Sequence, residues 1–494
     1  MKEQVYNPYL PGWEHIPDGE PYVFGDRLYI YGSHDKFGGE EHCMNDYVCW
    51  STPVDDLSQW RYEGVIYKRT DDPTYDGASY LFAPDIQLGL DGRYYMYYAF
   101  NRSSVMSVAV CDTPSGQYRY HGVVKKPDGT AIGSNPNDVK QFDPGVFIDD
   151  DQRIYLYSGF APKIPPRLSW FEIGERKFEG AYVFELEPDM LTVKRGPELM
   201  IKGFLSGTEP DFKGHEFYEA SSMRKINGKY YFVYSSVNSH ELCYAVSDRP
   251  DGGFVYGGTI ISIGDVFLNG RKREDALNYL DNTHGGLVQV NGQWYIFYHR
   301  HSNLLKHSRQ ACAEPIWFEK DGSIKQVEVS SCGLNGGPLI GMGRYPARIA
   351  CNLMAKNGIN INRHIHDAFA DEISKYPCFS QDGEDREGGE DQYISNFKDG
   401  AIAGYKYFDF EGAKKITVKI RGDVQGIITV STKLLGLPSE NNLRLGKAAT
   451  QIEISPAKDW QEFSAPLNIA DGVQVLYFSF AGTGTLEFIE FELE

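Results

Sequence analysis

The stretch DGRYYMYYAF, residues Asp91–Phe100, decides the fold class, because its turn leads into alternating aromatic residues and the pattern returns four more times. The other copies are GDRLYIYGSH (Gly25–His34), DQRIYLYSGF (Asp151–Phe160), NGKYYFVYSS (Asn227–Ser236) and NGQWYIFYHRH (Asn291–His301). Each copy is typical of a tight turn that enters a strand of period two. The turns are 66, 60, 76 and 64 residues apart, which is room for about four short strands per unit. The sequence therefore predicts an all-β five-bladed β-propeller, with a β-sandwich that carries similar hairpins as the alternative.

The pattern changes near residue 340. Beyond it lie an acidic, Gly-rich stretch (DGEDREGGED), predicted to be a solvated loop, and three alternating runs, without a long amphipathic helix: Asp382–Asp391, Lys414–Arg421, Gly426–Thr432 and Val473–Phe480. We therefore expect a propeller over residues 1–340 and a separate C-terminal β-sandwich over residues 341–494.

The composition excludes several classes of protein. Among 494 residues, 49 are Lys or Arg and 68 are Asp or Glu, and the formal net charge of −19 disfavours nucleic acid and anionic membranes as partners. No apolar run approaches the ~18 residues of a membrane helix. Met1–Pro11 contains no hydrophobic stretch, so we expect a cytoplasmic protein. Eight cysteines without a CxxC pair indicate free thiols in a reducing compartment and disfavour a zinc site.

A polar residue precedes each of the five aromatic strands. These residues are Asp18 in IPDGEP, Asp85 in FAPDI, Asp143 in QFDPGV, Glu219 in FYEASSMR and His284 in DNTHGG. The innermost strands of a propeller converge on an axial funnel, so we expect the five side chains to meet there. Hydrolysis of a glycosidic bond needs one protonated carboxyl group and one ionised carboxylate, and a third acid raises the pKa of the first by repulsion.

These motifs, with NPYLP at Asn7–Pro11, resemble glycoside hydrolase family 43 over most of residues 1–330, in the family's order. The family consists of five-bladed propeller glycosidases that act on side chains of plant polysaccharides. The resemblance implies that Asp18 is the general base, that Glu219 is the general acid, and that Asp143 orients the acid and tunes its pKa.

The resemblance implies further contacts. His284 is similar to the family's axial histidine, near which a cation such as calcium or a water lies, and no organic cofactor is expected. Arg309, in SRQA, resembles an arginine that reaches into the sugar site. Asp85 either contacts substrate or supports the site. Trp13, Tyr80 and Phe82 either stack on sugar rings or pack within the propeller. His299 and His301 lack a third ligand motif for zinc.

Two departures from the family pattern affect these predictions. Asp18 is followed by Gly19-Glu20-Pro21 and not directly by Pro, which makes Glu20 a rival for the base. Phe82 stands where the family usually has Trp, so the sugar preference of relatives does not transfer directly.

The resulting hypothesis is an exo-acting, inverting bacterial glycosidase that releases L-arabinofuranose, D-xylose or both from hemicellulose-derived oligosaccharides, as in xylan degradation. Alternatives are a galactofuranosidase or arabinanase of the same fold, a retaining fructan- or sucrose-type hydrolase, and a non-catalytic sugar-binding propeller. The retaining class expects an Asn-Asp-Pro motif that Asn7–Pro11 lacks, and the binding protein would lack one of the three acids. The C-terminal region faintly resembles jelly-roll carbohydrate-binding modules of family 6 at Gly404–Phe410 and Val475–Gly484; alternatively, it covers the propeller without binding sugar.

Overall fold

The computed structural model describes residues 3–163, 177–207, 209–359, 375–386 and 392–494. Within these ranges the chain forms β-strands and short 3₁₀ turns and contains no α-helix, so the predicted all-β class is confirmed. In the same ranges we find no helix with the length and apolar character of a membrane span.

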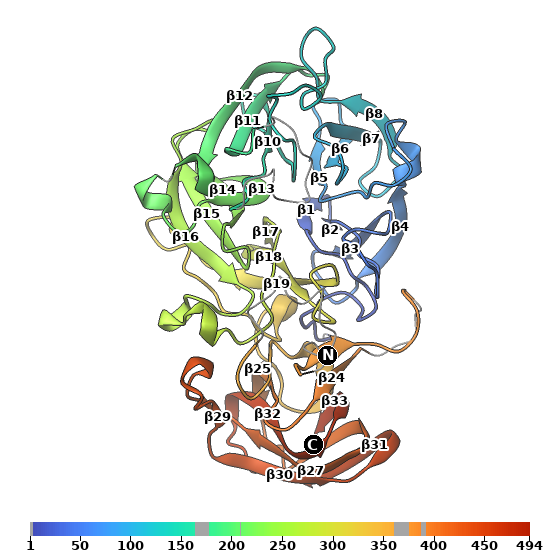
Figure 1. Ribbon diagram of the computed structural model, residues 1–494, viewed down its shortest axis with the longest axis vertical. Coiled ribbons are helices and arrows are strands. Elements are labelled where there is room, and N and C mark those ends of the chain that lie inside the picture. Colours follow the sequence, from blue (N-terminus) through green and yellow to red (C-terminus); the bar gives the residue numbers. More distant parts are fainter. Residues whose placement is uncertain (1–2, 164–176, 208, 360–374, 387–391) are drawn as a thin grey trace.

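Five small antiparallel sheets of consecutive strands make up the first two thirds of the chain and surround a common centre (Figure 1). The first holds β1 (Glu20–Phe24), β2 (Arg27–Tyr31), β3 (Tyr47–Pro53) and β4 (Arg61–Tyr67). The second holds β5 (Asp85–Leu88), β6 (Tyr94–Ala99), β7 (Met106–Cys111) and β8 (Arg119–Val123). The third holds β9 (Gly145–Ile148), β10 (Ile154–Ser158), β11 (Gly180–Leu186) and β12 (Val193–Lys202). The fourth holds β13 (Phe217–Ile226), β14 (Lys229–Ser236), β15 (Glu241–Ser247) and β16 (Val255–Ser262). The fifth holds β17 (Leu287–Val290), β18 (Gln293–His301) and β19 (Arg309–Ile316).

The five aromatic repeats supply the second strand of each sheet, namely β2, β6, β10, β14 and β18. Their period of two lets both faces of a sheet be buried, because successive side chains point to opposite faces. In β6, Tyr95 and Tyr97 join a core shared with the third sheet, whereas Met96 and Tyr98 join a core shared with the first. The turns and alternating aromatics therefore locate the sheets correctly.

A hydrophobic core fills the space between each pair of neighbouring sheets. The last such core joins the fifth sheet to the first: Val288 and Phe297 pack in one cluster with Leu28 and Trp50. A parallel bridge between Gly19 and Gly285 accompanies this packing. The fifth sheet thus packs against the first. The first strands β1, β5, β13 and β17 lie nearest the centre (Figure 1), and β9 contacts both β5 and β13.

Two six-stranded sheets form the C-terminal part. One follows the order β20 (Leu339–Ile340), β25 (Ile402–Phe410), β32 (Gly472–Gly484), β27 (Val424–Ser431) and β30 (Ala448–Ile454), with β22 (Asn352–Met354) beside β25. The other follows β23 (Cys378–Ser380), β24 (Tyr393–Phe397), β33 (Leu486–Leu493), β26 (Lys415–Gly422) and β31 (Ala457–Pro466), with β21 (Gly343–Pro346) beside β33. A short pair, β28 (Leu434–Leu435) and β29 (Arg444–Leu445), lies apart.

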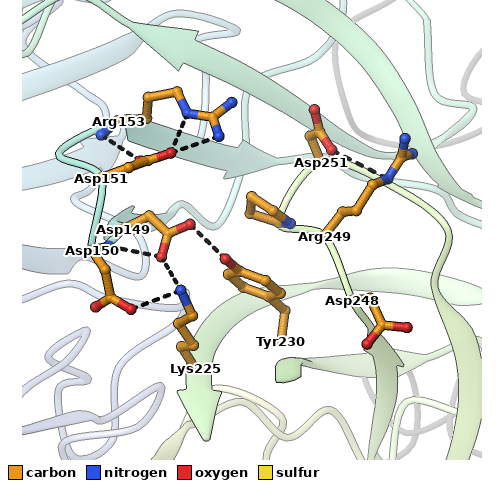
Figure 2. A pocket seen from close by; sticks show the side chains of 10 residues that line it. Asp149, Asp150, Asp151, Arg153, Lys225, Tyr230, Asp248, Arg249 and Asp251 are labelled. Atoms are coloured by element: carbon orange, nitrogen blue, oxygen red, sulfur yellow. Dashed lines mark hydrogen bonds and ion pairs between the residues drawn. The ribbon is translucent and has the colours of Figure 1, made fainter. Parts of the chain in front are cut away.

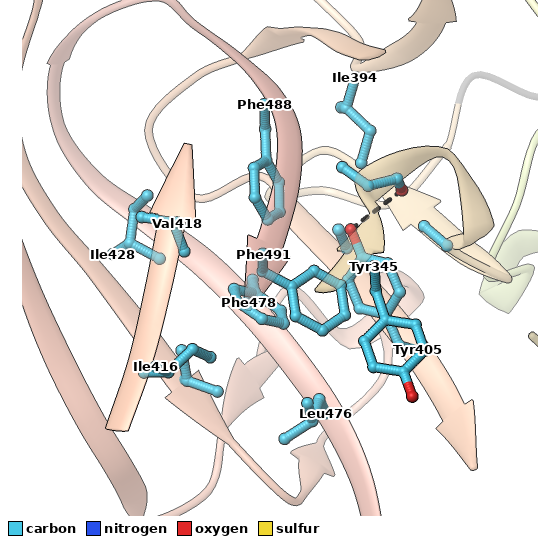
Figure 3. Packing of buried hydrophobic residues seen from close by; sticks show 14 of the residues in the cluster. Tyr345, Ile394, Tyr405, Ile416, Val418, Ile428, Leu476, Phe478, Phe488 and Phe491 are labelled. Atoms are coloured by element: carbon cyan, nitrogen blue, oxygen red, sulfur yellow. Dashed lines mark hydrogen bonds between the residues drawn. The ribbon is translucent and has the colours of Figure 1, made fainter. Parts of the chain in front are cut away.

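One aromatic core joins these two sheets (Figure 3). Phe478 of β32 packs against Phe488 and Phe491 of β33, with ring centroids 5.4 and 5.2 Å apart. Burying such rings stabilises a fold by ~1.5–3 kcal/mol each. The three predicted alternating runs correspond to β26, β27 and β32.

In the predicted solvated loop Asp382–Asp391, residues 382–384 are exposed as expected, whereas Asp385 and Arg386 differ from the prediction. Asp385 and Arg386 are half-buried because they bond to the first sheet's loops. Residues 387–391 of this loop lie outside the described residues.

Candidate active site

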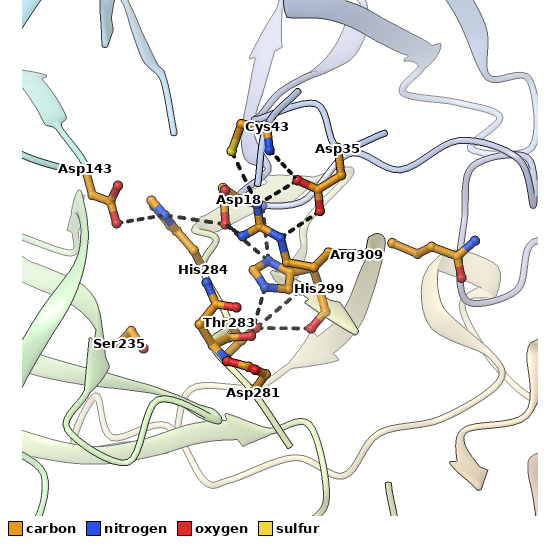
Figure 4. A network of polar contacts seen from close by, with 12 residues as sticks. Asp18, Asp35, Cys43, Asp143, Ser235, Asp281, Thr283, His284, His299 and Arg309 are labelled. Carbon is orange, nitrogen blue, oxygen red and sulfur yellow. Dashed lines mark hydrogen bonds and ion pairs between the residues drawn. The ribbon is translucent and has the colours of Figure 1, made fainter. Parts of the chain in front are cut away.

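Four acids and a histidine stand at the start of the five first strands, as the sequence predicts. Asp18 precedes β1, Asp85 opens β5, Asp143 precedes β9, Glu219 lies near the start of β13 and His284 precedes β17. Because these strands surround one centre, the chain brings distant residues together there (Figure 4).

Asp18 is held from two sides. Its backbone N–H donates to Nδ1 of His299 at 3.2 Å, and its Oδ1 accepts a hydrogen bond from Nη1 of Arg309 at 3.0 Å. Its φ of 58° lies in the left-handed region, a costly conformation that tends to occur at functional sites. Asp18 is 4% exposed, so its carboxylate is fixed in a largely dry position.

Arg309 joins Asp18 to a second acid, Asp35. Its Nε and Nη2 donate to the two carboxylate oxygens of Asp35 at 2.8 and 3.0 Å, and Asp35 in turn accepts the N–H of Cys43 at 2.9 Å (Figure 4). This bidentate geometry leaves Nη1 free to meet Asp18 and sets the direction of the guanidinium. The sequence analysis missed Asp35, although it directly follows the first aromatic repeat, where a strand delivers polar residues to the centre.

Asp143 and Glu219 form a repelling pair. Burial, then the charges of Glu219 and Asp18, raises the pKa of Asp143 well above its ordinary value. Burial, then the charge of Asp18, raises the pKa of Glu219 to about 8. Glu219 therefore carries its proton at neutral pH and is able to donate it.

The backbone beside Asp143 and Glu219 departs from regular strand geometry. Asp143 and Ala220 have φ of 44° and 70°, and the N–H of Ala220 donates to the Asp143 carboxylate. The register of β13 against β14 shifts on both sides of Glu219, as a β-bulge does when it redirects a side chain. The left-handed backbone and the register shift therefore both occur at the two acids.

His284 lies among the acids. Its Nδ1 is 3.6 Å from Asp143 and 4.0 Å from Asp18, and its Nε2 is 4.0 Å from Glu20. Both ring nitrogens are buried without a hydrogen-bond partner. Burial lowers the pKa of His284 to about 4, so the ring is neutral at neutral pH. Both its free lone pair and its N–H are therefore available at the centre.

Glu20, the rival base, is engaged elsewhere. Its Oε2 accepts hydrogen bonds from Arg224 at 2.9 Å and Ser222 at 3.1 Å, and the residue is completely buried. A base must meet a water molecule, so this geometry favours Asp18.

Asp85 joins three first strands. It accepts hydrogen bonds from the Tyr22 hydroxyl at 2.6 Å and from the N–H groups of Ile86 and Val146, at 2.7 and 2.6 Å. These contacts tie β1 and β9 to β5, which favours the supporting role over substrate contact.

The aromatic candidates lie at different places. Phe82 packs 5.7 Å from Phe142, the neighbour of Asp143. Trp13 packs 5.9 Å from Trp50 and has the guanidinium of Arg386 5.2 Å from its ring. The half-buried ring of Tyr80 has Arg69 5.1 Å from its centroid. Phe82 is thus the candidate nearest the acids in these contacts.

The histidine and cysteine side chains that are candidate metal ligands take part in hydrogen bonds within the protein. His299 and His301 each place Nε2 2.9 Å from the carbonyl oxygen of Asn282. Among the described residues, His215, Glu241 and Cys243 hold ligand atoms within 4.8 Å of one another. Glu241 already accepts hydrogen bonds from His215, Asn238 and Thr259, which accounts for its oxygens.

A pocket of about 380 Å³ lies among charged residues of the third and fourth sheets (Figure 2). The pocket lies at the turns that end β9, β13 and β15, and its lining residues are Asp149–Asp151, Arg153, Lys225, Tyr230 and Asp248–Asp251. Asp143 and Glu219 stand at the opposite ends of β9 and β13. Lys225 and Tyr230 satisfy Asp149 at 2.6 and 2.5 Å, so this pocket is a charged surface hollow.

A protonated Glu219 and an Asp18 paired with Arg309 are the two carboxyl groups that cleavage of a glycosidic bond requires. The fold and site thus define a glycoside hydrolase. The chain belongs to the glycosyl hydrolases family 43, whose family model matches residues 7–324.

Known relatives agree with this assignment. A xylosidase/arabinosidase of Thermoclostridium stercorarium is 48% identical over 100% of this chain and 99% of that protein. Xylosidase/arabinosidase 43A of Humicola insolens is 32% identical over 62% of this chain and 95% of its own length. The solved structure of an arabinoxylan arabinofuranohydrolase from Bacillus subtilis, in complex with cellotetraose, has a TM-score of 0.50 at 21% identity, covering 99% of this chain and 97% of that one. That structure bears on the fold alone.

Proposed function

We propose that the protein is an exo-acting, inverting glycosidase that releases L-arabinofuranose and D-xylose from the ends of hemicellulose-derived oligosaccharides. The observation that carries the proposal is the joint burial of Glu219, Asp143 and Asp18, which keeps Glu219 protonated beside a carboxylate paired with arginine. The full-length similarity to a xylosidase/arabinosidase supports the choice of sugars.

We propose that the five small sheets are the blades of a propeller, because a core lies between every neighbouring pair and between the fifth and the first. The two larger sheets, which share one aromatic core, are then a C-terminal β-sandwich. The predicted division into residues 1–340 and 341–494 remains part of this proposal. The first strands would point their starts into the axial funnel, where a terminal sugar fits.

Glu219, Asp18 and Asp143 have different roles in hydrolysis of the glycosidic bond. Glu219 transfers its carboxyl proton to the glycosidic oxygen as the bond from that oxygen to the anomeric carbon breaks. A water attacks the anomeric carbon from the opposite face and gives its proton to Asp18, so one water is consumed and the configuration inverts. Asp143 and Glu219 repel each other when both are ionised, so the pair favours a state that keeps a proton. Arg309 orients Asp18, and Phe82 offers a ring beside the acids.

His284 and the acids around it fit a cation or a bound water. Both nitrogens of His284 and Oε1 of Glu20 are buried without hydrogen-bond partners, 4.0 Å apart at their nearest approach. A hard cation such as calcium would be held mainly through oxygen ligands, with waters completing its shell. When bound, it would supply positive charge that offsets repulsion among the acids.

A panel of nitrophenyl glycosides tests the sugar preference. We expect the wild-type protein to release nitrophenol from the α-L-arabinofuranoside and the β-D-xylopyranoside. Glu219→Gln should lose most of its activity on arabinoxylan oligosaccharides, whose leaving group is a sugar. Release from a β-D-galactofuranoside alone would favour the galactofuranosidase alternative. Inactivity of the wild-type protein on all glycosides and on arabinoxylan oligosaccharides would contradict the proposal.

A further inference from the structure

A short segment of the C-terminal part reaches the first sheet. This bridging segment, Gln381–Arg386, follows β23 and is tied to its own sheets by Asp382, which accepts hydrogen bonds from Tyr393 and Arg421, each at 3.0 Å. At the end of the segment, Asp385 and Arg386 contact residues of the N-terminal part that lie beside the first sheet.

Arg386 pairs with a buried acid of the N-terminal part. Its Nη1 lies 2.6 Å from both carboxylate oxygens of Glu14, whose side chain is 0% exposed. The guanidinium also lies 5.2 Å from the Trp13 ring and 5.0 Å from the Tyr62 ring. Although burial raises the pKa of Glu14, His34 and Arg386 lower it to about 2, so the pair is fully charged. A guanidinium held by one acid and two rings has little freedom.

Asp385 holds the loop that connects β2 to β3. Its Oδ1 accepts the N–H of Phe37 at 2.7 Å, and its Oδ2 accepts Nδ2 of Asn45 at 3.0 Å. Asn45 also donates to the carbonyl oxygen of Asp35 at 3.0 Å. The bridging segment therefore fixes both limbs of this loop.

Asp35 carries the connection to the proposed base. It binds Arg309 with both carboxylate oxygens, and Arg309 binds Asp18 at 3.0 Å. A continuous series of hydrogen bonds thus runs from Asp385 through Asn45, Asp35 and Arg309 to Asp18. Since Arg309 is 2% exposed, water has little access to replace these partners.

We propose that Asp385 and Arg386, from the C-terminal part, are positioning residues that hold Asp18 in place for hydrolysis. Asp385 acts through the β2–β3 loop, Asp35 and Arg309, and Arg386 acts through Glu14 and through His34 of the same loop, whose Nε2 lies 2.7 Å from Nη1 of Arg386. This inference rests on the proposed function, in which Asp18 activates water. It assigns the C-terminal part a share in catalysis that needs no sugar contact. Asp18 acts on water and not on the bound sugar, so misplacing it should lower kcat and leave KM nearly unchanged.

The test compares Asp385→Asn, Arg386→Lys and Arg386→Ala with Arg444→Ala, a control at an exposed arginine of the same part of the chain. With the full-length protein and a nitrophenyl arabinofuranoside or xyloside, we expect kcat to fall about tenfold or more in Asp385→Asn and Arg386→Ala, because small misplacements of a reacting group cost up to ~100-fold. KM should stay within about twofold, Arg386→Lys should be intermediate, and the control should match wild type.

A double-variant measurement separates positioning from general destabilisation. If Asp385 acts through Asp35, then Asp385→Asn combined with Asp35→Asn should be no slower than Asp35→Asn alone, because residues in one network are not additive. Multiplicative losses, a rise in KM with unchanged kcat, or wild-type kcat in Asp385→Asn would overturn the inference. Thermal melting identifies any variant that fails to fold, in which case Asp385→Asn decides. A wild-type protein inactive on every glycoside would instead defeat the proposed function.

Discussion

Replacing Glu219 with Gln should stabilise the protein while it removes the acid. The pKa of Glu219 is raised to about 8 by burial and by Asp18, against 4.5 for the free side chain, so folding forces the carboxyl group to keep a proton. At pH 7 this costs about 3 kcal/mol relative to a side chain that never ionises, and above pH 8 the cost levels off near ~5 kcal/mol. Gln has nearly the same shape and avoids this cost.

The direction of the pKa shift of Glu219 determines the pH range in which the stability of wild type changes. A raised folded-state pKa means that the stability of wild type is complete below pH ~4.5 and declines as pH rises toward about 8. Urea unfolding of both proteins at pH 4, 7 and 9 measures this difference. We expect equal stability at pH 4 and a growing advantage for Glu219→Gln at the higher values.

Although Glu219→Gln should be more stable than wild type, it should be less active. Hydrolysis of oligosaccharides should fall ~10²–10⁴-fold, the usual contribution of a general acid, whereas an aryl glycoside with a good leaving group should lose much less. A stability difference that is independent of pH, or equal losses on both substrates, would refute the assignment of Glu219 as a buried, protonated acid.

Three further predictions concern the same centre. Asp143→Asn removes repulsion on Glu219, so the alkaline limb of the pH–rate profile should move to lower pH; an unchanged limb contradicts the tuning role. A chelator should lower the melting temperature or activity if a cation sits beside His284, and no effect on either argues against one. Proton NMR in the first minutes of hydrolysis should detect a sugar of inverted configuration, since a base working through water needs carboxyl groups ~6.5–9.5 Å apart; a retained product rules out Asp18 as that base.

The sequence predicts the repeating sheets well because their signals are local. A turn and alternating aromatics, as in Asp91–Phe100, specify a strand and the two faces it buries without reference to distant residues. The acids at the starts of β1, β9 and β13 follow from the same repeat. The fifth sheet has three described strands where the repeat predicts about four.

Partners that meet across long separations escape such analysis. Asp35 has no motif of its own, and its contact with Arg309 spans 274 residues. The acidity of Asp382–Asp391 predicts solvation, yet Arg386 within it neutralises Glu14 across 372 residues. Glu20 pairs with Arg224, and this contact favours Asp18 over Glu20 as the base. It is likewise visible only in the three-dimensional structure.

The contact between Asp18 and Arg309 also determines when the site can form during synthesis of the chain. These residues lie 291 positions apart. At ~5–20 residues per second, a ribosome needs roughly 15–60 s to add that length. Throughout this interval β1 has neither the bridge at Gly285 nor the core it shares with the fifth sheet, so its strand edge and the apolar faces of Leu28 and Trp50 stay open to wrong partners. A nascent chain should remain inert toward sugars until its fifth sheet emerges, and a circular permutant that places β17 to β19 ahead of β1 should shorten that exposure.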